Sequence, residues 1–176
     1  MTENELDLLK KEAEASPDAQ YKLGIMYVYG DTVPVDYAEA VKLLTSAAEQ
    51  GHVEAAYNLA ICYHYGFGTE IDLEKALELY RFTAEKGYAK GKHLIGRFYY
   101  YGWVVDQDYK EAIKWFEASD NLQDPTTCGF NKCYIGVCLE KGLGVTHDHE
   151  KAKCCFDKAI SEGGEDAKAL IEKLLK

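Results

Sequence analysis

The sequence lacks any long run of apolar residues. No stretch approaches the roughly 18 consecutive apolar residues that a membrane-spanning helix needs, and Met1 to Glu5 are acidic where a secretory signal would be basic and then apolar. As given, the chain is expected to be cytoplasmic. A surplus of positive charge is also missing, since 20 basic and 30 acidic residues leave a formal net charge of −10. That charge repels phosphate backbones and anionic lipid, and so argues against nucleic-acid or membrane-surface binding.

Residues suited to nucleophilic catalysis are scarce. Only four serines occur, all near expected helix ends, and none lies in a nucleophile-elbow or phosphate-loop motif. Five of the six cysteines fall in the last third of the chain, so disulfides would leave the rest uncross-linked, and we expect them to be mostly reduced. With 47% hydrophobic and 28% charged residues, the composition is typical of a folded globular protein.

A repeat organises the chain. The segment from Tyr21 to Gly30 recurs 36 residues later at Tyr57 to Gly66, and again at His93 to Gly102. A fourth copy, Cys133 to Gly142, follows after 40 residues, so four residues are inserted between Asp120 and Thr127. Such a period is typical of repeat architectures, and the insertion predicts a longer loop.

The second half of each repeat unit keeps the same register. Apolar residues recur at helical spacing in both halves, and no segment alternates with the period of two that a strand requires. The unit is therefore predicted to be a pair of helices. Its second helix begins at a capping aspartate and carries an alanine four residues later. These positions are Asp36, Asp72, Asp108 and Asp148, with Ala40, Ala76, Ala112 and Ala152.

Glycines and small residues define the first helix of each pair. It is predicted to end at a glycine that can adopt positive φ, and a small residue inside it lets the two backbones approach closely. Capping boxes are predicted for Thr2 with Glu5, Asp36 with Glu39, and Asp108 with Glu111. The terminal glycines are Gly30, Gly66, Gly102 and Gly142, and the internal small residues are Gly24, Ala60, Gly96 and Gly136.

These features predict an all-α solenoid of four 36-residue helix pairs with a capping helix at each end, ten helices in all. Capping helices are needed because the terminal units would otherwise expose apolar faces. The whole chain, 1–176, is predicted to be one repeat domain, with a capping helix at 1–16, repeats at 17–52, 53–88, 89–127 and 128–163, and a second capping helix at 164–176.

The sequence resembles the Sel1-like repeat family, a subclass of tetratricopeptide-like helical repeats, over almost its whole length. The matching elements are a leading alanine, a Leu-Gly pair, Met-Tyr, a glycine-rich turn, Lys-Ala and a closing Ala-Ala-Glu-x-Gly. In two turns Thr32 and Val104 replace the second glycine, and the stretch from Glu117 to Asp124 has lost the closing motif. The matching residues are Ala19, Leu23-Gly24, Met26-Tyr27, Gly66-Phe67-Gly68, Gly142-Leu143-Gly144-Val145, Lys75-Ala76 and Ala47-Ala48-Glu49-Gln50-Gly51.

The resemblance implies a right-handed superhelix whose first helices line a concave surface. It also implies a scaffold or adaptor that binds a partner protein or peptide, with no catalytic centre, cofactor or metal. Helical spacing places one side of each first helix toward that surface, and this side is rich in aromatic residues, which are enriched at interface hot spots. The predicted protein-binding residues are Tyr21, Ile25, Tyr29, Tyr57, Ile61, His64, Tyr65, His93, Arg97, Tyr100 and Tyr101.

An alternative function is a thiol- or metal-dependent hydrolase built on the cysteine-rich fourth repeat. Cys133 shares its register position with His93. In this alternative Cys133 would be the nucleophile and His93 the base beside it, although no third residue is identified that would orient the histidine. A spacing of five turns successive helical cysteines about 140° apart, which opposes a shared metal site. Cys138 and Cys155 match core positions of other repeats, whereas Cys154 matches exposed ones.

A basic island of four cations stands out in the acidic chain. It could orient an acidic ligand or simply be a solvated helix end. Its members are Lys86, Lys90, Lys92 and Arg97.

Overall fold

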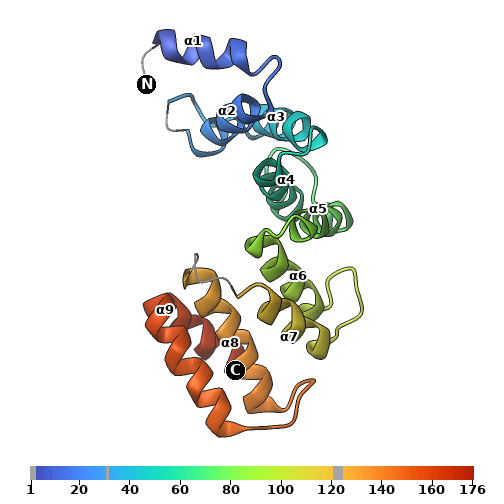
Figure 1. Cartoon of the computed structure of the whole chain (residues 1–176), viewed down its shortest axis with the longest axis vertical. Coiled ribbons are helices and arrows are strands. Elements are labelled where there is room, and N and C mark those ends of the chain that lie inside the picture. The colour runs from blue at the N-terminus through green and yellow to red at the C-terminus, as the bar shows by residue number, and fades with distance from the viewer. Residues whose placement is uncertain (1–2, 31, 121–124) are drawn as a thin grey trace. The chain divides into compact units, whose positions relative to one another are not determined.

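A computed structural model describes residues 3–30, 32–120 and 125–176, and this part of the chain forms nine helices and no strand (Figure 1). The prediction of an all-α fold is confirmed. Thr2, and with it the first predicted capping box, lies outside the described residues. The helices are α1 (Glu3–Glu12), α2 (Pro17–Tyr29), α3 (Tyr37–Glu49), α4 (Val53–Tyr65), α5 (Leu73–Glu85), α6 (Ala89–Tyr101), α7 (Tyr109–Ala118), α8 (Pro125–Lys141) and α9 (His149–Leu175).

The chain divides into two compact units. Unit 1 spans residues 1–86 and holds α1 to α5, and unit 2 spans residues 87–176 and holds α6 to α9. Helices α2 and α3, and α4 and α5, pack side by side in unit 1 (Figure 1). The same holds for α6 with α7 and α8 with α9 in unit 2. These are the helix pairs that the repeat predicted.

An aspartate caps the second helix of each pair, as predicted. Its carboxylate accepts a hydrogen bond from the backbone N–H three residues later, at 2.9 to 3.0 Å in all four pairs. Lys75 also lies 2.8 Å from the Asp72 carboxylate. The hydrogen bonds that Asp72 accepts from the Lys75 side chain and backbone lower the pKa of its carboxyl.

Of the two hydrogen bonds in each predicted capping box, the one accepted by the aspartate is found. The second, from the backbone N–H of the aspartate to the glutamate side chain, is replaced by another bond. The backbone N–H of Asp36 donates to the carbonyl of Tyr27 in the preceding helix at 3.0 Å, so that donor is already satisfied. Glu39 instead accepts a hydrogen bond from Lys42 at 2.9 Å. This backbone bond ties the start of the second helix to the end of the first. In the other predicted box, the backbone N–H of Asp108 donates to the carbonyl of Tyr99, and Glu111 accepts a hydrogen bond from Lys114.

Glycines end the first helices, and their φ angles explain why. Gly30, Gly66 and Gly102 have φ between 69° and 75°, and each donates its N–H to a carbonyl of the helix it ends. Val104, which replaces the second turn glycine, also has positive φ, at 52°. Left-handed backbone is unfavourable for a β-branched residue, so the turn of the third repeat holds its shape at a conformational cost.

Small residues let the paired helices approach closely. Ala40, Ala76, Ala112 and Ala152 are all fully buried. In unit 2 a Cβ at Gly96 would lie only 2.6 Å from a ring carbon of Phe116, which is also fully buried. The structure therefore supports the prediction that these small residues are required by packing.

Helix α8 is longer than the other first helices. It begins at Pro125 and has 17 residues, where α2, α4 and α6 have 13. It therefore starts about one helical turn earlier within its repeat. The boundary predicted between residues 127 and 128 falls inside this helix. The longer loop that the insertion predicts falls partly on residues 121–124, which lie outside the described residues.

Helix α9 contains the last predicted helix as well as the second helix of the fourth repeat. The two parts join at Gly164, whose φ of 58° and ψ of −143° are not helical. Nine helices are therefore found in the described residues, where ten are predicted. Ala167 and Ile171, beyond the kink, are buried against Cys133. This terminal segment covers the apolar face of the fourth repeat, as expected of a capping helix.

Candidate functional site

The most exposed predicted binding residues of unit 1 lie at the ends of its first helices. Tyr29, the last residue of α2, is 66% exposed, and Tyr65, the last residue of α4, is 49% exposed. Each immediately precedes the glycine that ends the helix. Each ring therefore lies next to a glycine with left-handed backbone, at the point where the chain leaves the helix.

Four other predicted residues of unit 1 are partly buried. Tyr21 and Ile25 pack against the cluster formed by α3 and α4, and the Tyr21 ring lies 4.6 Å from that of His52. Burial raises the pKa of the Tyr21 hydroxyl. Tyr57 lies 6.0 Å from the ring of Tyr80, and Ile61 is likewise half-buried. Each of these side chains is therefore only partly available at the surface.

His64 was expected to be open to a ligand, and this expectation is wrong because its side chain is only 8% exposed. Its Nδ1 lies 3.4 Å from the hydroxyl of Tyr80, a buried residue of the paired helix α5. Its ring stacks on Tyr65 at 4.5 Å. His64 therefore supports the exposed Tyr65 ring from beneath.

Two aromatic residues that the sequence analysis did not select extend this surface. Phe67, in the turn after α4, is 41% exposed, and Tyr37, at the start of α3, is 38% exposed. Phe67 stacks on Tyr65 at 5.8 Å and on Tyr37 at 5.3 Å. We call Tyr37, Phe67 and Tyr65 the aromatic row. A large apolar residue between two turn glycines, as in Gly66-Phe67-Gly68, was the available sequence signal.

In unit 2, Tyr101 is 36% exposed at the end of α6, in the position of Tyr65 in α4. Its ring stacks on Trp103 at 4.7 Å, and the Arg97 guanidinium lies 5.6 Å from the Trp103 ring centre. Tyr100, by contrast, was expected on the binding surface and is only 7% exposed. It packs at 4.9 to 5.2 Å against Tyr134, Tyr101 and Tyr109, and burial raises its pKa. The expectation for Tyr100 is therefore also wrong.

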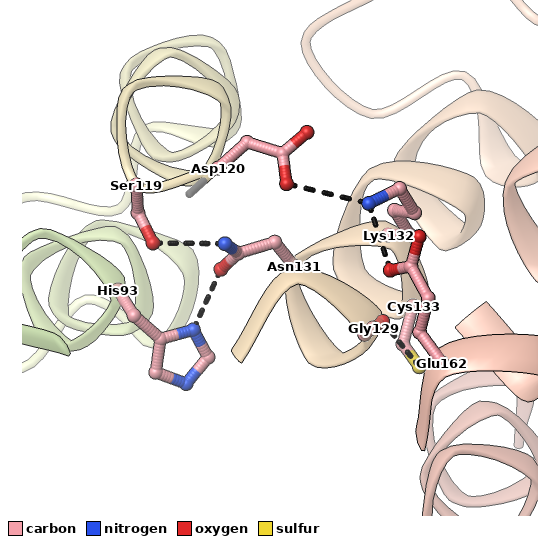
Figure 2. A network of polar contacts seen from close by, with 8 residues as sticks. All are labelled: His93, Ser119, Asp120, Gly129, Asn131, Lys132, Cys133 and Glu162. Atoms are coloured by element: carbon pink, nitrogen blue, oxygen red, sulfur yellow. Dashed lines mark hydrogen bonds and ion pairs between the residues drawn. The ribbon is translucent and has the colours of Figure 1, made fainter. Parts of the chain in front are cut away.

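His93 belongs to a polar network that joins three helices of unit 2 (Figure 2). Its Nδ1 lies 2.7 Å from Oδ1 of Asn131 in α8, and the Asn131 amide donates to Ser119 at the end of α7 at 2.8 Å. Asn131 and Ser119 are both almost fully buried. Buried polar groups that satisfy one another fix the relative positions of their helices.

An ion-paired lysine adds to the same junction. Lys132 Nζ lies 3.3 Å from the Asp120 carboxylate and 2.9 Å from that of Glu162 in α9 (Figure 2). The pKa of Lys132 is raised, because these two carboxylates outweigh the opposing effect of burial. The third and fourth repeats are thus joined by specific polar contacts where the family's closing motif is missing.

The cysteines give the hydrolase alternative no support. Cys133 was expected to share the surface position of His93, but it is fully buried and donates its thiol hydrogen to the Gly129 carbonyl at 3.3 Å (Figure 2). Burial raises the pKa of both Cys133 and Cys138 to about 12, so these thiols are protonated near neutral pH. A protonated thiol is a poor nucleophile. Cys154 is exposed, as predicted.

No group of three or more His, Cys, Asp or Glu side chains able to hold a metal ion is found in residues 3–30, 32–120 and 125–176. His149, at the start of α9, has its Nδ1 2.9 Å from a carboxylate oxygen of Glu140 in α8. Nor does any helix in the described part have the length and apolar character needed to cross a bilayer.

Cavities occur at matching places in the two units. Each is bordered by two second helices and by the first helix that lies between them in the chain. In unit 1 a cavity of about 430 Å³ lies between α3, α4 and α5, with Leu59 and Leu79 in its wall. In unit 2 a cavity of about 330 Å³ lies between α7, α8 and α9, with Ile135 and Cys155 at the corresponding positions. These cavities were not predicted from the sequence, because the predicted binding residues were all taken from the first helices.

Charge is distributed unevenly between the two units. Residues 1–86 contain 16 acidic and 7 basic residues, a formal charge of −9, whereas residues 87–176 contain 14 acidic and 13 basic residues. The predicted basic island is divided between them, with Lys86 in unit 1 and Lys90, Lys92 and Arg97 in unit 2. Lys86, which directly follows α5, has its Nζ 5.7 Å from the ring centre of Phe82 in that helix.

Comparison with known proteins gives the same fold. A Sel1 repeat protein from Oxalobacter formigenes is 27% identical with a TM-score of 0.79, and the match covers 90% of this chain and 63% of that one. A protective antigen present in uropathogenic Escherichia coli strains, which displays an SLR fold, is 25% identical with a TM-score of 0.66, over 97% of this chain and 44% of that one. Cysteine rich protein B from Helicobacter pylori is 25% identical with a TM-score of 0.52, over 80% of this chain and 98% of that one.

The chain spans 63% and 44% of the lengths of the first two of these structures. No curated protein matches it. A family model described as the Sel1 repeat matches residues 17–52, 53–88, 89–119 and 133–164, which together make up more than half of the sequence. The resemblance inferred from the repeat is thereby confirmed, and the chain belongs to the Sel1 repeat family.

Proposed function

We propose that this chain is a non-enzymatic scaffold that binds a partner protein or peptide through the exposed side chains of its first helices. The observation that carries the proposal is the recurrence of an exposed tyrosine, Tyr29, Tyr65 or Tyr101, at the end of α2, α4 and α6. Each ring presents a large, rigid surface with a polar hydroxyl, the combination that is enriched at binding hot spots.

The packing beneath these rings also favours a binding role. Tyr65 rests on the buried His64, and Tyr101 rests on Trp103 and the buried Tyr100. A ring held in this way loses little conformational freedom when a partner binds, so more of the contact energy appears as affinity. The partly buried residues Tyr21, Ile25, Tyr57, Ile61, His93 and Arg97 are proposed as further contact residues, because each keeps part of its surface accessible.

The test is capture of partners from the native host with the wild-type chain and with a variant in which Tyr29, Tyr65 and Tyr101 are all alanine. Captured proteins are quantified by mass spectrometry, and the affinity of the leading partner is then measured with purified components. Because truncation of a hot-spot residue costs more than about 1 kcal/mol, the triple variant should bind at least about tenfold more weakly.

A matched control is available in three exposed aliphatic residues, Leu8, Ile71 and Ile160. Their joint replacement by alanine removes apolar surface at other positions and should change the affinity by less than twofold. Circular dichroism establishes that both variants keep the helicity of the wild type. Equal binding by the tyrosine variant and the wild type would refute the proposal.

A further inference from the structure

The aromatic row of unit 1, Tyr37, Phe67 and Tyr65, has the properties of a site for a cationic side chain. We propose that it binds an arginine- or lysine-bearing segment of the partner protein, with the cation over the exposed rings. The inference rests on the proposed binding function and specifies the chemistry of the partner at one surface.

The geometry of the row supports such a site. The centroids of Phe67 and Tyr65 are 5.8 Å apart with a 27° angle between the rings, and those of Phe67 and Tyr37 are 5.3 Å apart with a 21° angle. The three rings are thus roughly parallel and stacked, and each is more than a third exposed. Aromatic faces attract cations through the ring quadrupole, and guanidinium groups also stack on them.

The chain contains its own example of this interaction in unit 2. Trp103 occupies the same turn position as Phe67, 36 residues later, and the Arg97 guanidinium lies over its ring at 5.6 Å. In unit 1 the residue at the register position of Arg97 is Ile61, which carries no charge. The third repeat therefore supplies a cation to its turn ring from its own first helix, whereas the second repeat leaves Phe67 exposed to solvent.

Charge complementarity selects a cationic occupant over a neutral one. Unit 1 has a formal charge of −9. Two acidic residues lie close in sequence to the row: Glu70, which is exposed in the same turn as Phe67, and Asp36, which immediately precedes Tyr37. A field of this sign attracts a basic segment and raises its association rate, and it repels a second copy of unit 1.

The experiment uses the full-length chain and a pair of synthetic peptides. One is a capped peptide with three arginines separated by Gly-Ser, and the other carries citrulline, the uncharged isostere, at the same positions. Binding is measured by isothermal titration calorimetry, and the contact surface is mapped by NMR. We expect the arginine peptide to bind more tightly, to shift resonances of the aromatic row, and to lose affinity as sodium chloride is raised from about 50 to 500 mM.

Two variants separate a cation–ring contact from a general apolar contact. The double variant Tyr65→Leu, Phe67→Leu keeps much of the apolar surface but removes two π faces. If each exposed cation–ring contact contributes its usual amount, the double variant should bind the arginine peptide about fivefold to thirtyfold more weakly. The control is Ile71→Ala, which alters an exposed aliphatic residue in the same turn and should change the affinity less than twofold.

Each alternative outcome contradicts the inference. Equal affinity for the arginine and citrulline peptides would show a neutral occupant, and full affinity in the leucine double variant would show simple apolar contact. Concentration-dependent dimerisation that the double variant abolishes would identify a second copy of the chain as the occupant. If instead a captured partner depends on Tyr29, Tyr65 and Tyr101 but presents no basic segment to the row, this inference fails while the proposed function stands.

Discussion

Replacing Gly96 with alanine tests whether close helix packing sets the register of unit 2. The new Cβ would lie 2.6 Å and 2.7 Å from two ring carbons of Phe116, about 1 Å closer than an ordinary contact between carbon atoms. Phe116 is fully buried and stacks on Tyr134 at 4.8 Å, so its ring cannot turn aside without disturbing the core. The helices α6 and α7 would have to separate.

The magnitude follows from two opposing effects. Overpacking of this kind costs up to about 3 kcal/mol, and the better helix propensity of alanine offsets about 1 kcal/mol. We therefore expect the Gly96→Ala variant to lose about 2 kcal/mol of unfolding free energy. Urea denaturation followed by circular dichroism measures the loss, with the slope against urea reporting any change in cooperativity.

Gly24→Ala is the matched control, since Gly24 has the same register in α2. Its added Cβ would lie 3.2 Å from Cγ of Leu44, so this neighbour needs to move by only a few tenths of an ångström. Ala60 already occupies this register position in α4 and is fully buried. We expect a change within about 0.5 kcal/mol, because small strain and improved propensity nearly cancel. Equal stability of the two alanine variants would refute the packing argument.

Three further predictions concern stability and thiol reactivity. Ala76→Leu should destabilise unit 1 by about 1 to 3 kcal/mol in the same urea assay, because Ala76 is fully buried; unchanged stability would contradict its assigned position. Since the pKa of Asp72 is lowered in the folded state, its contribution to stability is present above its ordinary value of 3.8 and is lost as the pH falls below that value. Acid titration of Asp72→Ala should therefore show a weaker fall in stability than the wild type between about pH 4 and pH 2; identical curves would show that the cap does not matter. At pH 8 a maleimide should label the exposed Cys154 in the native chain, and Cys133, with a pKa of about 12, only after unfolding; rapid native labelling of Cys133 would contradict its burial.

The helix boundaries could be predicted from sequence because their determinants are local. An aspartate that caps a helix and a glycine that ends one each act within a few residues, and the repeat displays each of them four times. The early start of α8 was not predicted. This helix begins four residues before the position that corresponds to the start of α6, although Pro125 is a residue typical of the first turn of a helix.

The exposure of individual rings could not be predicted, because it depends on neighbours from other helices. Helical spacing assigns His64 and Tyr65 to the same side of α4, but only His64 is covered, by Tyr80 of α5. Tyr100 is covered in the same way by Tyr109 and Tyr134. Helical periodicity gives the direction of a side chain and not the size of the residue that faces it, so the candidate site was predicted less accurately than the fold.

Site-specific photo-cross-linking tests whether the exposed tyrosines at the ends of the first helices contact a partner protein. A photoreactive benzoylphenylalanine is placed at Tyr65 or Tyr29, and at Lys42, whose side chain is 73% exposed on the second helix α3, and the native host is irradiated. We expect a covalent adduct with one partner protein from positions 65 and 29 and none from position 42. Adducts from position 42, with none from position 65, would contradict it.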